Sequence, residues 1–388
     1  MRYRKTIVVI SLLTMVLILF RNCTIKDATG NDPRGTAYAG AASCASCHKD
    51  ITSSFVHTSH YKTSSETSQD SLQKPASSTN NMLYYADSSL VKLEEKHEQY
   101  FQSLIAGGKT LRSEPMDIAF GSGEKAQTYA YWKGHELFQL PLTYYTGNNS
   151  WTNSPGYSID KPFFDRVILS RCLECHASFV SKVTVESGPM QVSEQMEPGS
   201  IVFGIDCERC HGPAAAHVKF QQEHPGYKTG EFITSINALN RQQKLDLCGS
   251  CHSGNDQDVV VSLFAFKPGD TLSNFFLPQF GSGNSPEPDV HGKQMQLMMS
   301  SKCFQQSLMT CMTCHDAHRD EVNQMNVFVS KCMGCHGQSK HAKQMIMNTK
   351  TCIDCHMPLL PSKKLIFNNG VETRNISYML RSHRIAVY

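Results

Sequence analysis

Pairs of cysteines separated by two residues and followed directly by a histidine occur seven times in this chain of 388 residues. Two thiols at this spacing can add to the two vinyl groups on one porphyrin edge, and the histidine then faces the iron as an axial ligand. The pattern Cys-x-x-Cys-His is typical of c-type haem attachment, and chance would give only about 0.03 copies in a chain of this composition. The sequence therefore predicts seven covalently bound haems. The attachment cysteines of motifs one to seven are Cys44 and Cys47, Cys172 and Cys175, Cys207 and Cys210, Cys248 and Cys251, Cys311 and Cys314, Cys332 and Cys335, and Cys352 and Cys355. The proximal iron ligands are His48, His176, His211, His252, His315, His336 and His356.

Two other uses of paired cysteines fit the pattern less well. A structural zinc site would pair motifs in even numbers and would not need a histidine after every second cysteine. A disulfide framework is disfavoured because 14 of the 16 cysteines belong to the motifs, which leaves only Cys23 and Cys303.

The N-terminus indicates export. A basic start is followed by an apolar run of 14 residues, Ile7 to Phe20, which is typical of a secretory signal and short for a spanning helix. Cys23 follows directly, so the protein is either lipid-anchored through Cys23, held by an uncleaved N-terminal anchor, or cleaved further on. The residues before Cys23 are larger than those usual at a lipidation site. We expect a periplasmic or cell-envelope protein, associated with the membrane through its N-terminus.

The formal charge of +3 changes to −1 if residues 1–22 are removed, because they carry four basic residues and no acidic one. Two propionates on each haem would make the mature protein more acidic. This charge disfavours nucleic acid as a partner and favours redox proteins with basic patches.

Roughly 55 residues are available for each haem, which is too few for an ordinary apolar core around each group. We therefore expect a mainly α fold with long irregular loops, organised by the haems, and an apo chain that does not fold. The expected parts are a signal or anchor (1–22), motif one with a polar linker (23–81), a haem-free insert (82–165), a six-haem region (166–360) and a surface-wrapping tail (361–388). In the small insert, residues 128–140 predict a β-hairpin that turns at Gly134, and residues 294–306 predict a helix before motif five.

Ten histidines lie outside the motifs, so the count alone requires no haem to keep an open distal side. A second histidine gives a low-spin iron suited to electron transfer, whereas an open side can bind a small substrate. Three residues span about 10 Å, so His318 cannot pass around the porphyrin held by His315 and must reach another haem. The candidate distal ligands are His60, His217, His291, His318, His341 and His383.

Other histidines are less suitable as ligands. We expect only one of His57 and His60 to bind iron, and we interpret His97 and His224 as surface or turn residues; His135 could be either. Motifs two and four have no spare histidine nearby in the sequence, which makes their haems the candidates for an open site.

Several segments resemble the cytochrome c554-like multihaem cytochromes, relatives of the octahaem hydroxylamine oxidoreductase group. They include Tyr38 to His48 with His60, Ser154 to Tyr157, Cys207 to His217, Met309 to His318 and Cys352 to Pro358. The resemblance implies bis-histidine haems in stacked pairs and distal roles for His60, His217, His318 and His383. The chain lacks the Cys-x-x-Cys-Lys motif of the related nitrite reductases, and it shows no strong counterpart of an eighth haem or of a crosslinking tyrosine.

Three functions fit these observations. The first is an electron-transfer protein with closely packed, mostly bis-histidine haems, and we favour it over catalysis. The second is a multihaem oxidoreductase that acts on a small nitrogen or sulfur compound at one open haem. The third is a subunit that passes electrons to other cytochromes or to a quinone-linked membrane complex. No catalytic residue is predicted.

Overall fold

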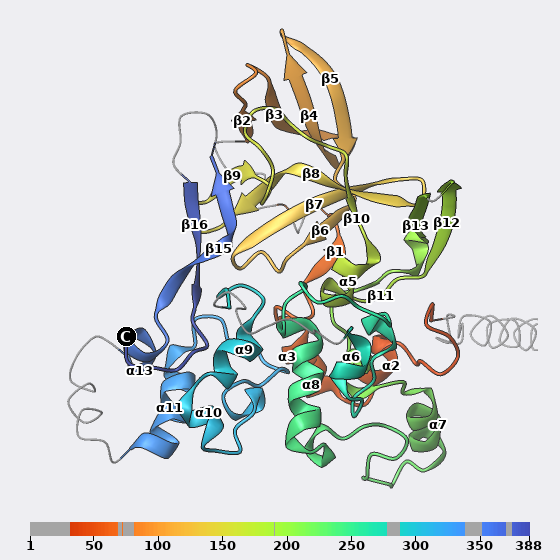
Figure 1. Cartoon of the computed structure of the whole chain (residues 1–388). Coiled ribbons are helices and arrows are strands. Elements are labelled where there is room, and N and C mark those ends of the chain that lie inside the picture. The colour runs from red at the N-terminus through yellow and green to blue at the C-terminus, as the bar shows by residue number, and fades with distance from the viewer. Residues whose placement is uncertain are drawn as a thin grey trace, which may run out of the picture.

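The computed structural model describes residues 32–68, 72, 81–189, 191–277, 288–337, 351–369 and 375–388. The predicted signal or anchor, Cys23 and His341 lie outside the described residues, as does most of the polar linker after residue 68. A group of short helices lies below a larger body of antiparallel strands (Figure 1). Helix and strand are almost equally abundant, at about 28% and 29%. The prediction of a mainly α fold was therefore wrong.

Five helices end at the histidine of a haem motif. They are α5 (Ser170–His176), α6 (Cys207–His211), α8 (Arg241–His252), α11 (Met325–His336) and α13 (Cys352–His356). Residues three apart lie on one helix face, so each of these helices presents both cysteines on the same side. Motif one begins inside α2 (Ala41–Ala45) at Cys44 and ends at His48, the N-cap of α3 (Lys49–Phe55). Motif five begins in the 3₁₀ helix η5 (Cys311–Thr313).

Side-chain caps fix where several motif helices begin. Asp206 accepts a hydrogen bond from the backbone N–H of Arg209 (2.9 Å) at the start of α6. Asn240 and Gln243 form a capping box that starts α8. These caps pair N–H groups that the first helical turn leaves without intrahelical partners, so the motif position within each helix is set by local sequence.

The other helices connect the motifs. They are α7 (Ala215–Glu223), α9 (Gln294–Met299), α10 (Lys302–Gln305) and the 3₁₀ helices η1 (Pro198–Ser200), η2 (Ile236–Ala238), η3 (Leu263–Ala265) and η4 (Leu272–Phe275). The single helix predicted over residues 294–306 is in fact the two helices α9 and α10, which are separated by Ser300 and Ser301.

The strands above the helices form two main antiparallel sheets, which we call the β module. The six-stranded sheet has the order β1-β6-β7-β8-β10, with β9 paired to β8, and the four-stranded sheet has the order β2-β3-β4-β5. The first sheet contains β1 (Ser64–Glu66), β6 (Ile118–Phe120), β7 (Ala126–Lys133), β8 (Glu136–Tyr145), β9 (Ser150–Asn153) and β10 (Arg166–Ile168). The second contains β2 (Met82–Tyr84), β3 (Leu90–Lys96), β4 (Gln99–Ala106) and β5 (Lys109–Pro115).

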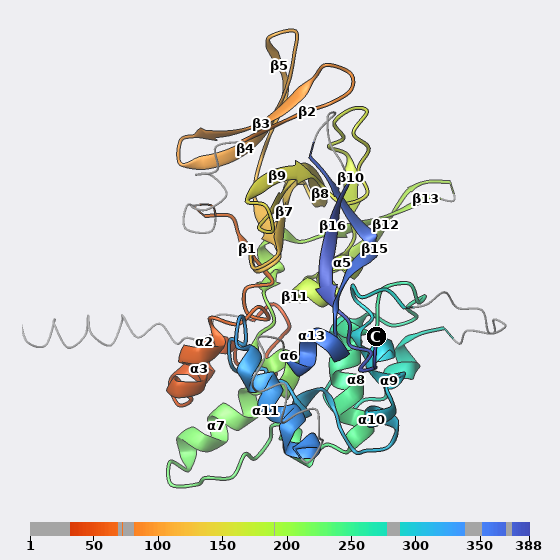
Figure 2. The same cartoon turned by 90° about the vertical axis from the view of Figure 1, so that its left-hand side faces the viewer.

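Three two-stranded sheets complete the fold. They pair β11 (Ala177–Phe179) with β14 (Val202–Phe203), β12 (Lys182–Gly188) with β13 (Gln191–Met196), and β15 (Leu359–Asn368) with β16 (Asn375–Arg381). The β15–β16 pair rises from the helices along the side of the β module (Figures 1 and 2). Phe367 of β15 is buried and stacks on Tyr145 of β8, with ring centres 4.8 Å apart. The tail that was predicted to wrap the surface therefore runs along the β module and docks on it through Phe367.

The main apolar core lies in the β module. Trp151 is fully buried, with its ring centre 5.4 Å from that of Tyr129 and 5.6 Å from that of Tyr144. The predicted hairpin is confirmed: β7 pairs with β8, and Lys133 lies opposite Glu136 across the turn at Gly134. The amount of strand was underestimated, because alternation was recognised in one hairpin only. Short strands such as β1 are stabilised by pairing with strands that are distant in the sequence.

Candidate haem sites

The structure places histidines from outside the motifs beside motif histidines. The rings of His211 (motif three) and His318 have centres 6.0 Å apart and planes 11° apart. Metal–imidazole bonds are about 2.0–2.1 Å long, so two imidazoles on opposite sides of one iron would have ring centres about 6.3 Å apart. The spacing of this pair therefore fits one iron atom between the two rings.

Two further pairs have the same spacing. His252 (motif four) and His60 have ring centres 6.1 Å apart and planes 88° apart. His315 (motif five) and His383 have ring centres 6.2 Å apart and planes 26° apart. In all three pairs the second histidine belongs to a part of the chain far from the motif it faces, so each pair joins separate segments.

The surroundings of motif two differ. His176 lies 5.9 Å from the ring of Phe120 and interacts through its Nδ1 with the Thr63 hydroxyl (3.2 Å). His291 is near enough for His176 to lower its pKa, after the larger lowering caused by burial. Motif four, which lacks a spare histidine in the local sequence, thus has His60 beside it in space.

Hydrogen bonds fix the orientation of several candidate ligands. The Nδ1 atoms of His211, His217 and His356 donate to backbone carbonyls of Thr234 (3.1 Å), Glu231 (2.8 Å) and Ala386 (2.8 Å). Such a bond sets the tautomer and leaves Nε2 as the available ligand atom. His315 makes the corresponding bond to a carboxylate, that of Glu321 (2.7 Å).

The protonation of the candidate ligands also suits metal binding. Burial, and to a smaller extent the neighbouring His315, lower the pKa of His383 to about 4. Burial likewise lowers the pKa of His211. Both imidazoles are therefore neutral near pH 7, the form that coordinates iron.

The packing of the helices is a further test of whether haem fits. Helices of globular proteins normally bury an apolar stripe, yet α2, α3, α7 and α11 contain no buried residue. This packing is expected where porphyrins supply much of the apolar surface. Within the described ranges, no group of three or more Cys, His, Asp or Glu side chains is arranged to hold a metal ion.

Contacts between cysteines show which motifs are neighbours. The Cys44 and Cys207 thiols interact, which raises the pKa of Cys44 and lowers that of Cys207 and brings motif one against motif three. The same kind of contact joins motif two to motif four through Cys175 and Cys251. A third joins motif four to motif five, through Cys248 and Cys311.

The β module packs against motif two, and the segment after β14 holds His60 in place. Leu173, inside motif two, belongs to the same buried cluster as Ile118 and Leu137 of the six-stranded sheet. His60 is held through its carbonyl, which accepts from Ile205 N–H (2.9 Å). Gly204 has a φ of +64°, and a Cβ there would lie 2.0 Å from the carbonyl oxygen of Tyr61. Only glycine allows this close approach.

Other candidates from the sequence lie away from the motif histidines. His97 occupies the β3–β4 turn with a φ of +51°, His57 is exposed after α3, and His224 ends α7 with its ring 4.3 Å from that of Phe220. His135 lies in the β7–β8 turn, where its Nδ1 interacts with the carbonyl of Met196 (3.2 Å).

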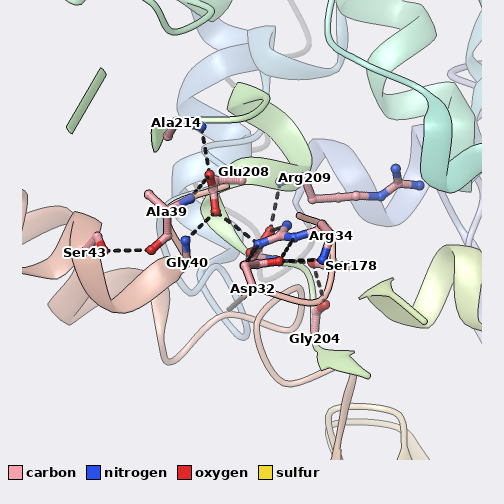
Figure 3. Close-up of polar contacts among 11 residues, drawn as sticks. Asp32, Arg34, Ala39, Gly40, Ser43, Ser178, Gly204, Glu208, Arg209 and Ala214 are labelled. Atoms are coloured by element: carbon pink, nitrogen blue, oxygen red, sulfur yellow. Dashed lines mark hydrogen bonds and ion pairs between the residues drawn. The ribbon is translucent and has the colours of Figure 1, made fainter. Parts of the chain in front are cut away.

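Sequence reasoning missed two charged residues inside motif three. Glu208 and Arg209 are both buried, and their side chains make hydrogen bonds to distant segments. Figure 3 shows the bonds of Glu208. The available signal was a pair of opposite charges in the two variable positions between the cysteines.

Comparison with known proteins supports the haem assignment. Residues 144–212 match the model of the family "Cytochrome c554 and c-prime", a segment that includes motifs two and three. No curated protein and no solved structure matches the chain significantly.

The motifs and this match define a c-type cytochrome, a protein of electron transfer with covalently bound haem c. Residues 144–212 are similar to the cytochrome c554 family, and the predicted resemblance is confirmed to that extent. The match does not extend to the octahaem group.

Proposed function

We propose that this protein carries seven c-type haems, mostly with two histidine ligands, and conducts electrons through them outside the cytoplasm. The observation that carries the proposal is the spacing of about 6 Å between motif histidines and second histidines in three separate places. Saturated axial ligation leaves an iron no site for substrate and suits it to electron transfer. The chain's contribution is to hold each pair of imidazoles in a fixed orientation.

The contacts among motifs support one connected array. Motif one contacts motif three, and motif four contacts motifs two and five, through the cysteine pairs described above. Motif five lies against the helix of motif six, since the rings of His315 and Phe328 have centres 5.1 Å apart, and α11 of motif six contacts α13 of motif seven. Cys251 of motif four is near enough to Cys210 of motif three to raise its pKa, after the larger effect of burial. We infer a path in the order one, three, four, five, six, seven, with motif two as a branch at motif four.

Exposure of the cysteines agrees with this order. Motifs one, two, six and seven each have one exposed cysteine, at Cys47, Cys172, Cys335 and Cys355, whereas those of motifs three, four and five are all partly buried. Electrons would therefore enter and leave at motifs one, two, six or seven. Redox proteins, such as other cytochromes or a quinone-linked membrane complex, are the proposed partners.

The alternative is an oxidoreductase with one open haem that acts on a small nitrogen or sulfur compound. Its sequence support came from motifs two and four, and the 6.1 Å spacing between the His60 and His252 rings argues against an open haem at motif four. Electron transfer is therefore the function that the geometry favours.

The deciding experiment is an EPR and optical study of the oxidised protein, with haem counted as the pyridine haemochrome. Seven low-spin haems that do not bind CO after reduction are expected. A high-spin fraction of one haem in seven that binds CO or nitrite would establish the enzymatic alternative.

The proposed location is the periplasm or cell envelope, with the N-terminus at the membrane and Cys23 as a candidate lipid anchor. The basic start and the apolar run from Ile7 to Phe20 support it. Among the described residues, no helix is long and apolar enough to cross a membrane. Mass spectrometry of the mature N-terminus would distinguish lipidation at Cys23 from an uncleaved anchor or cleavage further on.

A further inference from the structure

The two residues between the cysteines of motif three are charged and buried. Glu208 is 3% exposed and Arg209 is 9% exposed. Buried charges are costly unless hydrogen bonds and opposite charges compensate them, so the partners of these side chains show what they stabilise. The partners lie on two different haem motifs.

Glu208 holds the segment that leads into motif one. One carboxylate oxygen accepts from the backbone N–H groups of Ala39 (2.9 Å) and Ala214 (2.8 Å), and the other accepts from Gly40 N–H (2.9 Å) and the Arg34 guanidinium (3.0 Å). Figure 3 shows the carboxylate between these groups. Four donors satisfy one carboxylate, three of them from the segment just before motif one.

Arg34 completes this contact. Its side chain is 4% exposed and pairs with Asp32 (2.9 Å), with Asp206 (2.7 Å) and with Glu208. Asp206 is also the N-cap of the motif-three helix. Arg34 therefore ties the chain before motif one to the start of the helix that carries motif three.

Arg209 extends away from this cluster (Figure 3). Its guanidinium donates to the backbone carbonyl of Glu174 (3.2 Å) and to that of Leu263 (2.7 Å). Glu174 lies between the two cysteines of motif two and is itself buried. Neighbouring residues of motif three thus hold two different motifs.

We propose that Glu208 and Arg209 are positioning residues that fix motif one and motif two against motif three from separate directions, and so set the electronic coupling among these three haems. The proposal rests on the seven-haem electron-transfer function above. Both side chains act through hydrogen bonds to the backbone that carries the neighbouring motifs.

The test uses the holoprotein and the variants Glu208→Gln and Arg209→Lys. Glutamine keeps the shape of glutamate but replaces one oxygen with an amide nitrogen, which cannot accept. Either Ala39 and Ala214 or Gly40 and Arg34 therefore lose their acceptor. Lysine lacks the planar fork that reaches two carbonyls at once. EPR-monitored potentiometry follows each haem, with the signals of haems one, two and three assigned from His48→Met, His176→Met and His211→Met.

Glu208→Gln should shift the potentials and coupling of haems one and three, leave haem two unchanged, and speed hydrogen exchange at whichever of Ala39 and Gly40 loses its acceptor. Arg209→Lys should instead change haems two and three and leave those two amides protected. The matched control is Glu223→Gln, an equal change of charge at an exposed position on α7, and it should change no haem signal.

Identical changes in the two variants, or a lower unfolding temperature with all haem signals unchanged, would show a merely structural role and overturn the proposal. If a variant incorporates haem poorly, loss confined to the predicted pair of motifs supports the proposal and uniform loss overturns it. Failure of the underlying function would be seen separately, as a CO-binding high-spin haem in the unmodified protein.

Discussion

The pairing of His60 with His252 makes a sharp prediction, because two histidines near motif one compete for the role of ligand. His60 lies 6.1 Å from the His252 ring, whereas His57 lies three residues earlier, in the turn after α3. The variant His60→Ala should leave the iron of motif four with His252 as its one protein ligand. His57→Ala is the matched control and should leave every haem unchanged.

The expected magnitude follows from the motif count and the ring angle. One haem in seven should become high-spin, and the reduced protein should bind one CO per chain. The 88° angle between the rings predicts a strongly anisotropic low-spin signal for this haem, because crossed imidazole planes bring the iron d orbitals close in energy. The near-parallel planes of the His211–His318 pair predict a rhombic signal instead.

The assay is EPR of the oxidised variant, followed by CO titration of the reduced one. The strongly anisotropic signal should disappear in His60→Ala while the rhombic signals remain. Loss of a rhombic signal, an unchanged spectrum, or an equal effect of His57→Ala would refute the assignment of His60 to motif four.

Four further predictions follow from the packing. Gly204→Ala should destabilise the fold and perturb the haem of motif four, because its Cβ would meet Tyr61; thermal unfolding and the same EPR signal would show both effects, and retention of both would contradict the close approach. Phe367→Ala should cost about 3–5 kcal/mol in the free energy of unfolding, measured with denaturant, since this ring is fully buried against β8. Hydrogen bonds from Arg112 lower the pKa of Asp165 in the folded protein. The stability that this pair contributes is therefore fully present above the ordinary aspartate pKa of about 3.9 and is lost as pH falls from there through the lowered pKa. Asp165→Asn should make the free energy of unfolding less dependent on pH in this acid range, and an unchanged dependence would exclude the contribution. The chain without haem should keep strand signal and lose helix signal in far-UV circular dichroism, because the apolar core lies in the β module; equal loss of both would contradict this division.

Some of the site could be predicted because it depends on local spacing. The two cysteines and the histidine of each motif must lie on one turn of chain to bind one haem, so their roles can be recognised from five consecutive residues. The β7–β8 hairpin was predictable for the same reason, since its turn and alternation are local. The β15–β16 pair was not, because Phe367 is stabilised by a strand more than two hundred residues away.

The distal side of the haems depends on tertiary structure. His318 follows motif five by three residues but lies against His211 of motif three, and His60 follows motif one but lies against His252 of motif four. The three-residue separation excluded the haem held by His315 as the partner of His318, but it could not identify the haem held by His211. The sequence by itself determined the chemistry, namely the attachment cysteines and proximal histidines, because those bonds form within one helical turn. Only the tertiary structure decided which motifs are neighbours and which second histidine faces each one, because backbone contacts such as those at Gly204 and Glu208 join segments far apart in the chain.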